Sequence, residues 1–216
     1  MKTIHIFTSV VRLLVVLFLS NCQKNETFVV EGRITDFYSD HPVQNVKIEL
    51  LYNSLNNGTF SNRYLNIAEA ETDENGIFKL EFDYVSAVNY NIRATRSGYF
   101  QGIFVYQRDD WALNETNIVN ERMLGQSSLE INLTNNNFNN QYLLRLSEHS
   151  LGCESCCNSG SYVFNSFSDT TVVCNVYSNQ TIGYELIDTE AGEVAKKTGS
   201  IFIKPGNNVL NFNLLD

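Results

Sequence analysis

The sequence predicts an all-β protein built from two tandem β-sandwich domains that follow a cleaved signal peptide. Two observations predict this class. Apolar residues occupy every second position in many short runs, the pattern of a strand with one buried face, and no stretch shows helical spacing. The 216 residues suffice for one large domain or two small ones, and 43% of them are hydrophobic, so the chain can bury a core.

Residues 1–21 are predicted to be a leader and not part of the fold. Lys2 and Arg12 are its only charged residues, and they precede the uninterrupted apolar run 13–19. A positive start followed by a short apolar core is typical of a secretory signal peptide. The run is too short for a membrane span, which needs about 20 residues.

The end of the leader, Leu19-Ser20-Asn21-Cys22, resembles the lipobox of bacterial lipoproteins. The resemblance implies cleavage before Cys22, diacylglycerol on its sulfur, and a third acyl chain such as palmitate on the new amino group. Two or more acyl chains anchor a protein stably. Residues 22–27 are therefore expected to form a lipidated tether. The lipid bilayer of the outer membrane is the expected location, on either its periplasmic or its cell-surface face.

The first sandwich is expected over residues 28–108, as short strands separated by turns. Tyr38 to Pro42 reads as a turn that ends in proline, and Asp73 to Gly76 reads as a tight hairpin whose glycine supplies a positive φ. One apolar face on each strand requires a second sheet to cover it. The expected strands are centred on residues 30–34, 46–52, 78–82, 90–94 and 103–106.

Four segments in this region resemble the carboxypeptidase regulatory-like domain. They are residues 31–36 (EGRITD), 42–48 (PVQNVKI), 72–78 (TDENGIF) and 97–99 (SGY), in that order. The resemblance covers about residues 28–106. It implies a transthyretin-like β-sandwich that serves as a non-catalytic structural or binding module, and no functional residue carries over from it.

Residues 109–126 mix charged residues and asparagine with the single Trp111, and are expected to be a connector. A second sandwich, immunoglobulin-like in class, is expected over residues 127–216. One long sandwich is the alternative, but the polar connector favours two domains. The alternating runs of the second domain are residues 129–133, 142–146, 172–176, 182–186, 201–203 and 210–214.

Cysteine usage predicts disulfides in the second domain. With Cys22 assigned to lipid, four cysteines in an oxidising compartment favour two disulfides. A bond between the adjacent Cys156 and Cys157 would form a strained ring, so two pairings remain. Either Cys153 pairs with Cys157 and Cys156 with Cys174, or Cys153 pairs with Cys156 and Cys157 with Cys174.

A metal site is the alternative for the same cysteine-rich loop, with His149 as an additional ligand. The loop lacks the second Cys-x-x-Cys or His pair that zinc sites commonly use. Disulfides are therefore favoured, and no metal or cofactor is predicted.

Composition and motifs argue against several classes of function. The net charge of −9 and the lack of a basic stretch argue against nucleic-acid binding. The sequence has no nucleophile elbow, phosphate-binding glycine loop or His-Glu-x-x-His motif, so no catalytic residue is predicted. His41 is expected to be exposed in a turn. The carboxylate pairs Glu69/Glu71, Asp73/Glu74 and Asp109/Asp110 are expected to be solvated surface.

Aromatic residues gather between positions 99 and 111, and they could form a platform for a glycan or a protein. A place in the sandwich core is the favoured interpretation, because large aromatic side chains are mostly buried. These residues are Tyr99, Phe100, Phe104, Tyr106 and Trp111.

The sequence thus predicts a non-catalytic, membrane-anchored envelope lipoprotein that acts as a binding or structural module. Its expected partners are the bilayer, through the acyl chains on Cys22, and an envelope protein or glycan. One alternative is an accessory subunit of an outer-membrane importer or adhesion complex. Another is a thiol-dependent or metal-dependent activity of the cysteine-rich loop.

Overall fold

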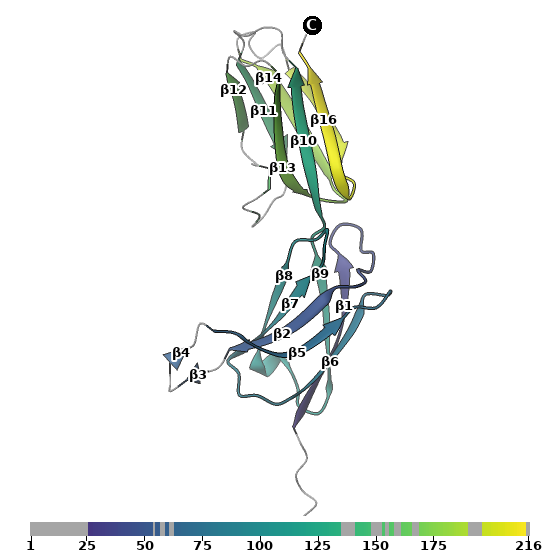
Figure 1. Ribbon diagram of the computed structural model, residues 1–216, viewed down its shortest axis with the longest axis vertical. Coiled ribbons are helices and arrows are strands. Elements are labelled where there is room, and N and C mark those ends of the chain that lie inside the picture. The colour runs from purple at the N-terminus through teal and green to yellow at the C-terminus, as the bar shows by residue number, and fades with distance from the viewer. Residues whose placement is uncertain are drawn as a thin grey trace, which may run out of the picture.

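The computed structural model contains two β-sandwiches arranged end to end (Figure 1). It describes residues 26–53, 55–56, 59–60, 63–134, 141–147, 153, 156–157, 161–165, 169–189 and 196–214. The chain enters the first sandwich at the end remote from the second, and its C-terminal strand ends at the opposite tip (Figure 1). Within the described ranges, no helix is long and apolar enough to cross a membrane. The predicted all-β architecture of two tandem sandwiches is confirmed.

The first sandwich packs a three-stranded sheet, in the order β6-β1-β9, against a four-stranded sheet, in the order β5-β2-β7-β8. The pair β3-β4 lies between β2 and β5 in the sequence. The bounds are β1 Thr27–Asp36, β2 Lys47–Asn53, β3 Leu55–Asn56, β4 Thr59–Phe60, β5 Leu65–Glu71, β6 Ile77–Asp83, β7 Asn89–Thr95, β8 Gly102–Gln107, the 3-10 helix η1 Arg108–Asp110 and β9 Thr116–Met123.

The second sandwich repeats this plan, with the sheets β13-β10-β16 and β12-β11-β14-β15. The bounds are β10 Gln126–Thr134, β11 Gln141–Ser147, β12 Ser161–Asn165, β13 Thr170–Tyr177, β14 Thr181–Asp188, β15 Lys196–Phe202 and β16 Gly206–Asn213.

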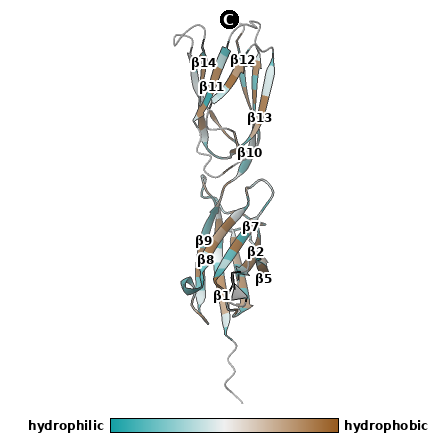
Figure 2. Ribbon diagram, turned by 90° about the vertical axis from the view of Figure 1, so that its left-hand side faces the viewer, coloured by the Kyte–Doolittle hydropathy of each residue, from teal (hydrophilic) through white to brown (hydrophobic). Residues whose placement is uncertain are grey.

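The alternation in the sequence selects the core positions of both domains. Figure 2 shows apolar and polar residues alternating along the strands, and the apolar residues that face the opposite sheet are the buried ones. The first core contains Phe28, Val30, Ile34, Ile48, Leu50, Phe78, Leu80, Phe82, Tyr90, Ile92 and Ala94. The second contains Leu129, Ile131, Leu133, Leu144, Leu146, Val176, Ile182, Leu186, Ile203, Leu210 and Phe212.

The predicted hairpin turn at Asp73 to Gly76 is also present. The Asp73 carboxylate accepts hydrogen bonds from the backbone N–H groups of Asn75 and Ile77, both at 2.8 Å. Gly76 has a φ of 73°, and a Cβ atom there would lie 2.4 Å from the Ile34 carbonyl oxygen. This position requires glycine for its conformation and for space.

The expected connector, residues 109–126, was a wrong assignment. Most of it belongs to the first sandwich, because β9 forms a parallel ladder with β1 from Val29 opposite Thr116 to Asp36 opposite Met123. Trp111 is buried in the first core and stacks on Tyr90 with ring centroids 4.8 Å apart. The first domain therefore extends to residue 123 and not to 108, and two residues separate β9 from β10.

The same parallel pairing closes the second domain. Its first strand, β10, pairs with its last, β16, from Ser127 opposite Gly206 to Thr134 opposite Asn213. Each ladder contains eight facing residue pairs. In both sandwiches the strand that begins the domain lies in the middle of its sheet and the strand that ends it lies at the edge.

Candidate functional site

Outside the two cores, hydrogen bonds and aromatic contacts gather where the two domains meet, a region here called the junction. It joins loops of both sandwiches around the two residues that connect them. The junction consists of Asp36, Tyr38, Gly98, Tyr99, Phe100, Leu124, Gly125, Tyr177, Ser178 and Asn179.

Hydrogen bonds hold the linker backbone from both sides. On the first-domain side, the N–H of Phe100 donates to the carbonyl oxygen of Leu124 at 2.9 Å. The N–H of Gln126, at the start of β10, donates to the carbonyl oxygen of Gly98 at 2.8 Å. On the second-domain side, the N–H of Ser178 donates to the carbonyl oxygen of Gly125 at 2.8 Å. The linker therefore has no free backbone length to act as a hinge.

Asp36, the last residue of β1, places a buried carboxylate at the junction, where it is 2% exposed. Its Oδ1 atom accepts from the N–H of Tyr38 at 3.1 Å and from the N–H and hydroxyl of Ser39, both at 2.9 Å. The Nδ2 of Asn179, in the second domain, donates to the same oxygen at 3.3 Å. One carboxylate thus orders the loop after β1 and also contacts the other domain.

The Asp36 carboxylate also affects Tyr99. Burial of the phenol is the largest cause that raises the pKa of Tyr99, and the negative charge of Asp36 raises it further. The positive charge of Arg96 lowers the pKa and so opposes the shift. The guanidinium of Arg96 lies 5.4 Å from the centre of the Tyr99 ring. Tyr99 therefore stays neutral over the physiological pH range and acts as a packing residue of the junction.

Gly125 is required at the junction for space. A Cβ atom at this position would lie 2.0 Å from the Ser178 hydroxyl oxygen and 3.2 Å from Oδ2 of Asp36. Real Cβ atoms do not approach other heavy atoms as closely as 2.0 Å. A side chain at residue 125 would therefore force the buried Ser178 hydroxyl, or the turn that carries it, to shift.

Aromatic rings from both domains cover the junction. Tyr177, which is 3% exposed, meets Phe100 at a centroid distance of 5.3 Å and Tyr38 at 6.5 Å. Phe37 extends this row at 5.1 Å from Tyr38 and is 46% exposed. The guanidinium of Arg122 lies 5.9 Å from the centre of the Phe37 ring. The row therefore passes from buried packing between the domains to an exposed aromatic edge.

The aromatic residues predicted as core divide into two groups. Phe104, Tyr106 and Trp111 contribute to the first core, as expected. Tyr99 also packs against that core but lies at the junction, and Phe100 contacts the second domain instead. The sequence gives no signal for this division, because it depends on where the second domain sits.

The cysteine-rich loop carries two disulfides. Cys153 is bonded to Cys156 and Cys157 to Cys174, which is the second of the two pairings left open by the sequence. Cys157 is 1% exposed and its N–H donates to the carbonyl oxygen of Asn175 at 2.8 Å. The Cys157–Cys174 bond therefore fastens the loop to β13 inside the second core, whereas Cys153 and Cys156 are partly exposed.

The remaining predicted residues do not come together in one site. Cys22 and His149 lie outside the described residues. His41 is exposed, and its carbonyl oxygen accepts from the N–H of Asp36 at 2.8 Å. Asp110 accepts from the N–H of Gln107 at 2.7 Å. Over the described part of the chain, no group of three or more His, Cys, Asp or Glu side chains could hold a metal ion.

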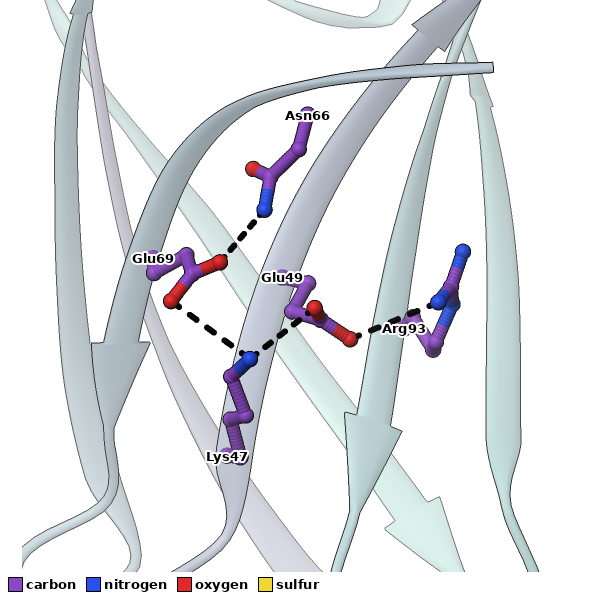
Figure 3. A network of polar contacts seen from close by, with 5 residues as sticks. All are labelled: Lys47, Glu49, Asn66, Glu69 and Arg93. Atoms are coloured by element: carbon purple, nitrogen blue, oxygen red, sulfur yellow. Dashed lines mark hydrogen bonds and ion pairs between the residues drawn. The ribbon is translucent and has the colours of Figure 1, made fainter. Parts of the chain in front are cut away.

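Glu69 belongs to a polar network on the outer face of the sheet β5-β2-β7-β8 (Figure 3). Lys47 contacts Glu49 at 3.0 Å and Glu69 at 3.5 Å, and Arg93 contacts Glu49 at 3.5 Å. The hydrogen bond that the Lys47 ammonium donates to the Glu49 carboxylate raises the pKa of Lys47. Two cations and two carboxylates balance one another across three strands, so the network stabilises strand pairing and leaves no net charge on this part of the face.

Comparisons with known proteins identify no family. No family profile matches the chain, and no curated protein matches it. The carboxypeptidase regulatory-like resemblance and the lipoprotein assignment therefore stay predictions.

Several solved structures are similar in fold. The TIE protein of Bacillus anthracis has a TM-score of 0.39 and 13% identity over 87% of this chain and 34% of that chain. The minor pilin GBS52 of Streptococcus agalactiae has a TM-score of 0.34 and 11% identity over 86% of this chain and 94% of that chain. Catechol 1,2-dioxygenase of Acinetobacter radioresistens has a TM-score of 0.33 and 13% identity over 49% of this chain and 54% of that chain. The chain spans about a third of the TIE chain, and similarities this low carry no inference about function.

Proposed function

We propose that this protein is a lipid-anchored, non-catalytic module of the bacterial envelope that holds a binding surface at a fixed distance and orientation from the outer membrane. Cys22 would carry the acyl chains. The five steps along the chain from Cys22 to Thr27, the first residue of β1, at about 3.5 Å each, would let the first sandwich sit no more than about 17 Å from the bilayer. The second sandwich would then project away from the membrane.

The junction is the observation that carries this proposal. A flexible tandem protein would have a solvated linker, and relative motion is the default between domains that share a small interface. Here both linker carbonyl oxygens accept hydrogen bonds from flanking loops. Asp36 and Asn179 add a side-chain bond between the domains, and Tyr177 packs on rings of the first domain. Such a junction favours a spacer over two independently moving modules.

The exposed end of the aromatic row is the part of this region that best fits a partner. Phe37 lies beside Arg122, which forms a 2.9 Å ion pair with Asp40. An apolar ring next to charged hydrogen-bonding groups suits a glycan, because a sugar ring has an apolar face and hydroxyl groups at its edge. The same residues would suit an envelope protein.

Two measurements on the natively expressed full-length protein test the proposal. Intact-mass analysis should find acylated Cys22 as the first residue, and Cys22→Ser should release the protein from membranes without detergent. Spin labels placed on exposed sites of each sandwich should give one narrow distance distribution. A retained initiator methionine with an unmodified Cys22 thiol would refute the anchor, and a broad distribution would refute the spacer.

A further inference from the structure

We infer that both sandwiches are built to bear tension along the long axis of the molecule. This inference goes beyond the proposed spacer function, since a spacer can be stiff without resisting a pulling force. It depends on how the first and last strands of each domain pair, and it does not require the lipid anchor.

In the first domain, the chain enters at the outer end of β1 and leaves at the junction end of β9. The two strands are parallel neighbours with eight facing pairs, from Val29 opposite Thr116 to Asp36 opposite Met123. Tension on the chain therefore pulls β1 and β9 in opposite directions along their common axis (Figure 1). The ladder is loaded in shear, so its hydrogen bonds share the force and must break together.

The second domain has the same geometry. The chain enters at the junction end of β10 and leaves at the far end of β16, and these strands form a parallel ladder of eight facing pairs. Tension between the junction and the far tip again shears the ladder (Figure 1). Two antiparallel terminal strands would put both attachment points at one end, and force would then separate their hydrogen bonds one at a time.

Neighbouring strands brace the two entering strands. β1 also pairs with β6, from Thr27 opposite Asp83 to Arg33 opposite Ile77, and β10 pairs with β13 from Gln126 opposite Tyr177 to Leu133 opposite Thr170. Pulling out β1 or β10 would therefore break two ladders. The ladders β1-β9 and β10-β16 are the weaker path, and they set the force at which each domain opens.

The Cys157–Cys174 disulfide provides a length signature for the second domain. It spans a sequence separation of 17 and lies outside the β10-β16 ladder. An intact bond prevents the 17 residue steps between the two cysteines from extending when the domain unfolds. At about 3.5 Å per step, less the 4.9 Å that already separates the two Cα atoms, it shortens the unfolded chain by about 55 Å. Reduction should lengthen one unfolding event by about 55 Å plus the few ångströms released by Cys153–Cys156, and should leave the other event unchanged.

Single-molecule pulling on the full chain tests this inference. With handles at the two ends of the described fold, near Glu26 and Leu214, we expect two unfolding events at high force, because forced unfolding is governed by the barrier to opening. The matched control places the second handle at Glu115, an exposed residue just before β9. Both attachment points then lie at the outer end of the β1-β9 ladder, so the same hydrogen bonds break in sequence.

Shear loading should give an unfolding force of the first domain several times that of the Glu115 control at the same pulling speed. Equal forces in the two geometries would overturn the inference, whatever Cys22 carries. A first event that unfolds both sandwiches together would also overturn it, since each ladder is predicted to open separately.

Discussion

Replacement of Gly125 by alanine is the most direct perturbation of the junction. The new methyl group would lie 2.0 Å from the Ser178 hydroxyl oxygen, where an ordinary contact is 3.4 Å or more, and 3.2 Å from Asp36 Oδ2. Forcing an extra carbon into a packed site costs about 1–3 kcal/mol. We expect Gly125→Ala to lower the free energy of unfolding by about that amount and to broaden the distance distribution between spin labels in the two domains.

The chain offers a rescue and a control for this variant. Ser178→Ala removes the clashing oxygen and leaves the residue 178 Cβ at 3.4 Å, an ordinary contact, and Asp36 Oδ2 at 3.2 Å, a tight one. Gly125→Ala/Ser178→Ala should therefore recover most, but not all, of the stability and should restore the narrow distribution. Gly206 has a φ of 98° and no atom within 4 Å of an added Cβ. Gly206→Ala should therefore cost about 1 kcal/mol through backbone strain and leave the interdomain distances unchanged. Wild-type stability and distances in Gly125→Ala, or failure of the rescue, would refute the packing argument.

Three other predictions follow from the described contacts. Asp36→Ala removes the carboxylate that accepts from the N–H groups of Tyr38 and Ser39, and should lower the free energy of unfolding by about 1–3 kcal/mol in chemical denaturation. Asp36→Asn should lose less stability, because its amide oxygen can still accept these hydrogen bonds. Burial raises the pKa of Tyr90 to about 12. The stability that the neutral Tyr90 phenol contributes is therefore complete below about pH 10, the ordinary tyrosine pKa, and is lost as the pH rises through about 12. Tyr90→Phe should lose less stability than the wild type over that pH window. Mild reduction followed by alkylation and peptide mapping should label Cys153 and Cys156 before the buried Cys157, and simultaneous labelling of all four cysteines would contradict this order. Removal of the Cys157–Cys174 bond should lower the free energy of unfolding by about 3 kcal/mol in the chain-entropy model.

The sequence predicts the two cores well because burial in a sandwich follows strand alternation. In β6, for example, Phe78, Leu80 and Phe82 are buried and the residues between them are exposed. The Asp73 to Gly76 turn is equally local, since it depends on one carboxylate and one glycine. Such features need no information from distant parts of the chain.

The sequence does not predict β9, the last strand of the first domain, because β9 is an edge strand whose apolar and polar residues show little alternation. Only Val119 and Met123 are buried in β9, and Ile118 is 67% exposed. The side chain of Asn117 donates to the Val29 carbonyl oxygen at 3.1 Å, so a residue typical of loops helps to hold this strand in the sheet. A segment of this composition reads as a connector until its partner strand is known.

The junction could not be predicted because its contacts join residues far apart in the sequence. Asp36 and Asn179 are separated by 143 positions, and neither belongs to a recognisable motif. The disulfide pairing depends on geometry in the same way. Four clustered cysteines predict that bonds form, but only the course of the loop along β13 selects Cys157 as the partner of Cys174.

The parallel ladders also decide when each domain can close. Val29 finds its partner at Thr116 and Ser127 finds its partner at Gly206, so the sheet that contains β1 or β10 cannot be completed until nearly all residues of that domain have been synthesised. Pairing between strands so far apart in the chain makes folding slow. One edge of β1 and one edge of β10 therefore stay unpaired until the last strand of the same domain, β9 or β16, becomes available.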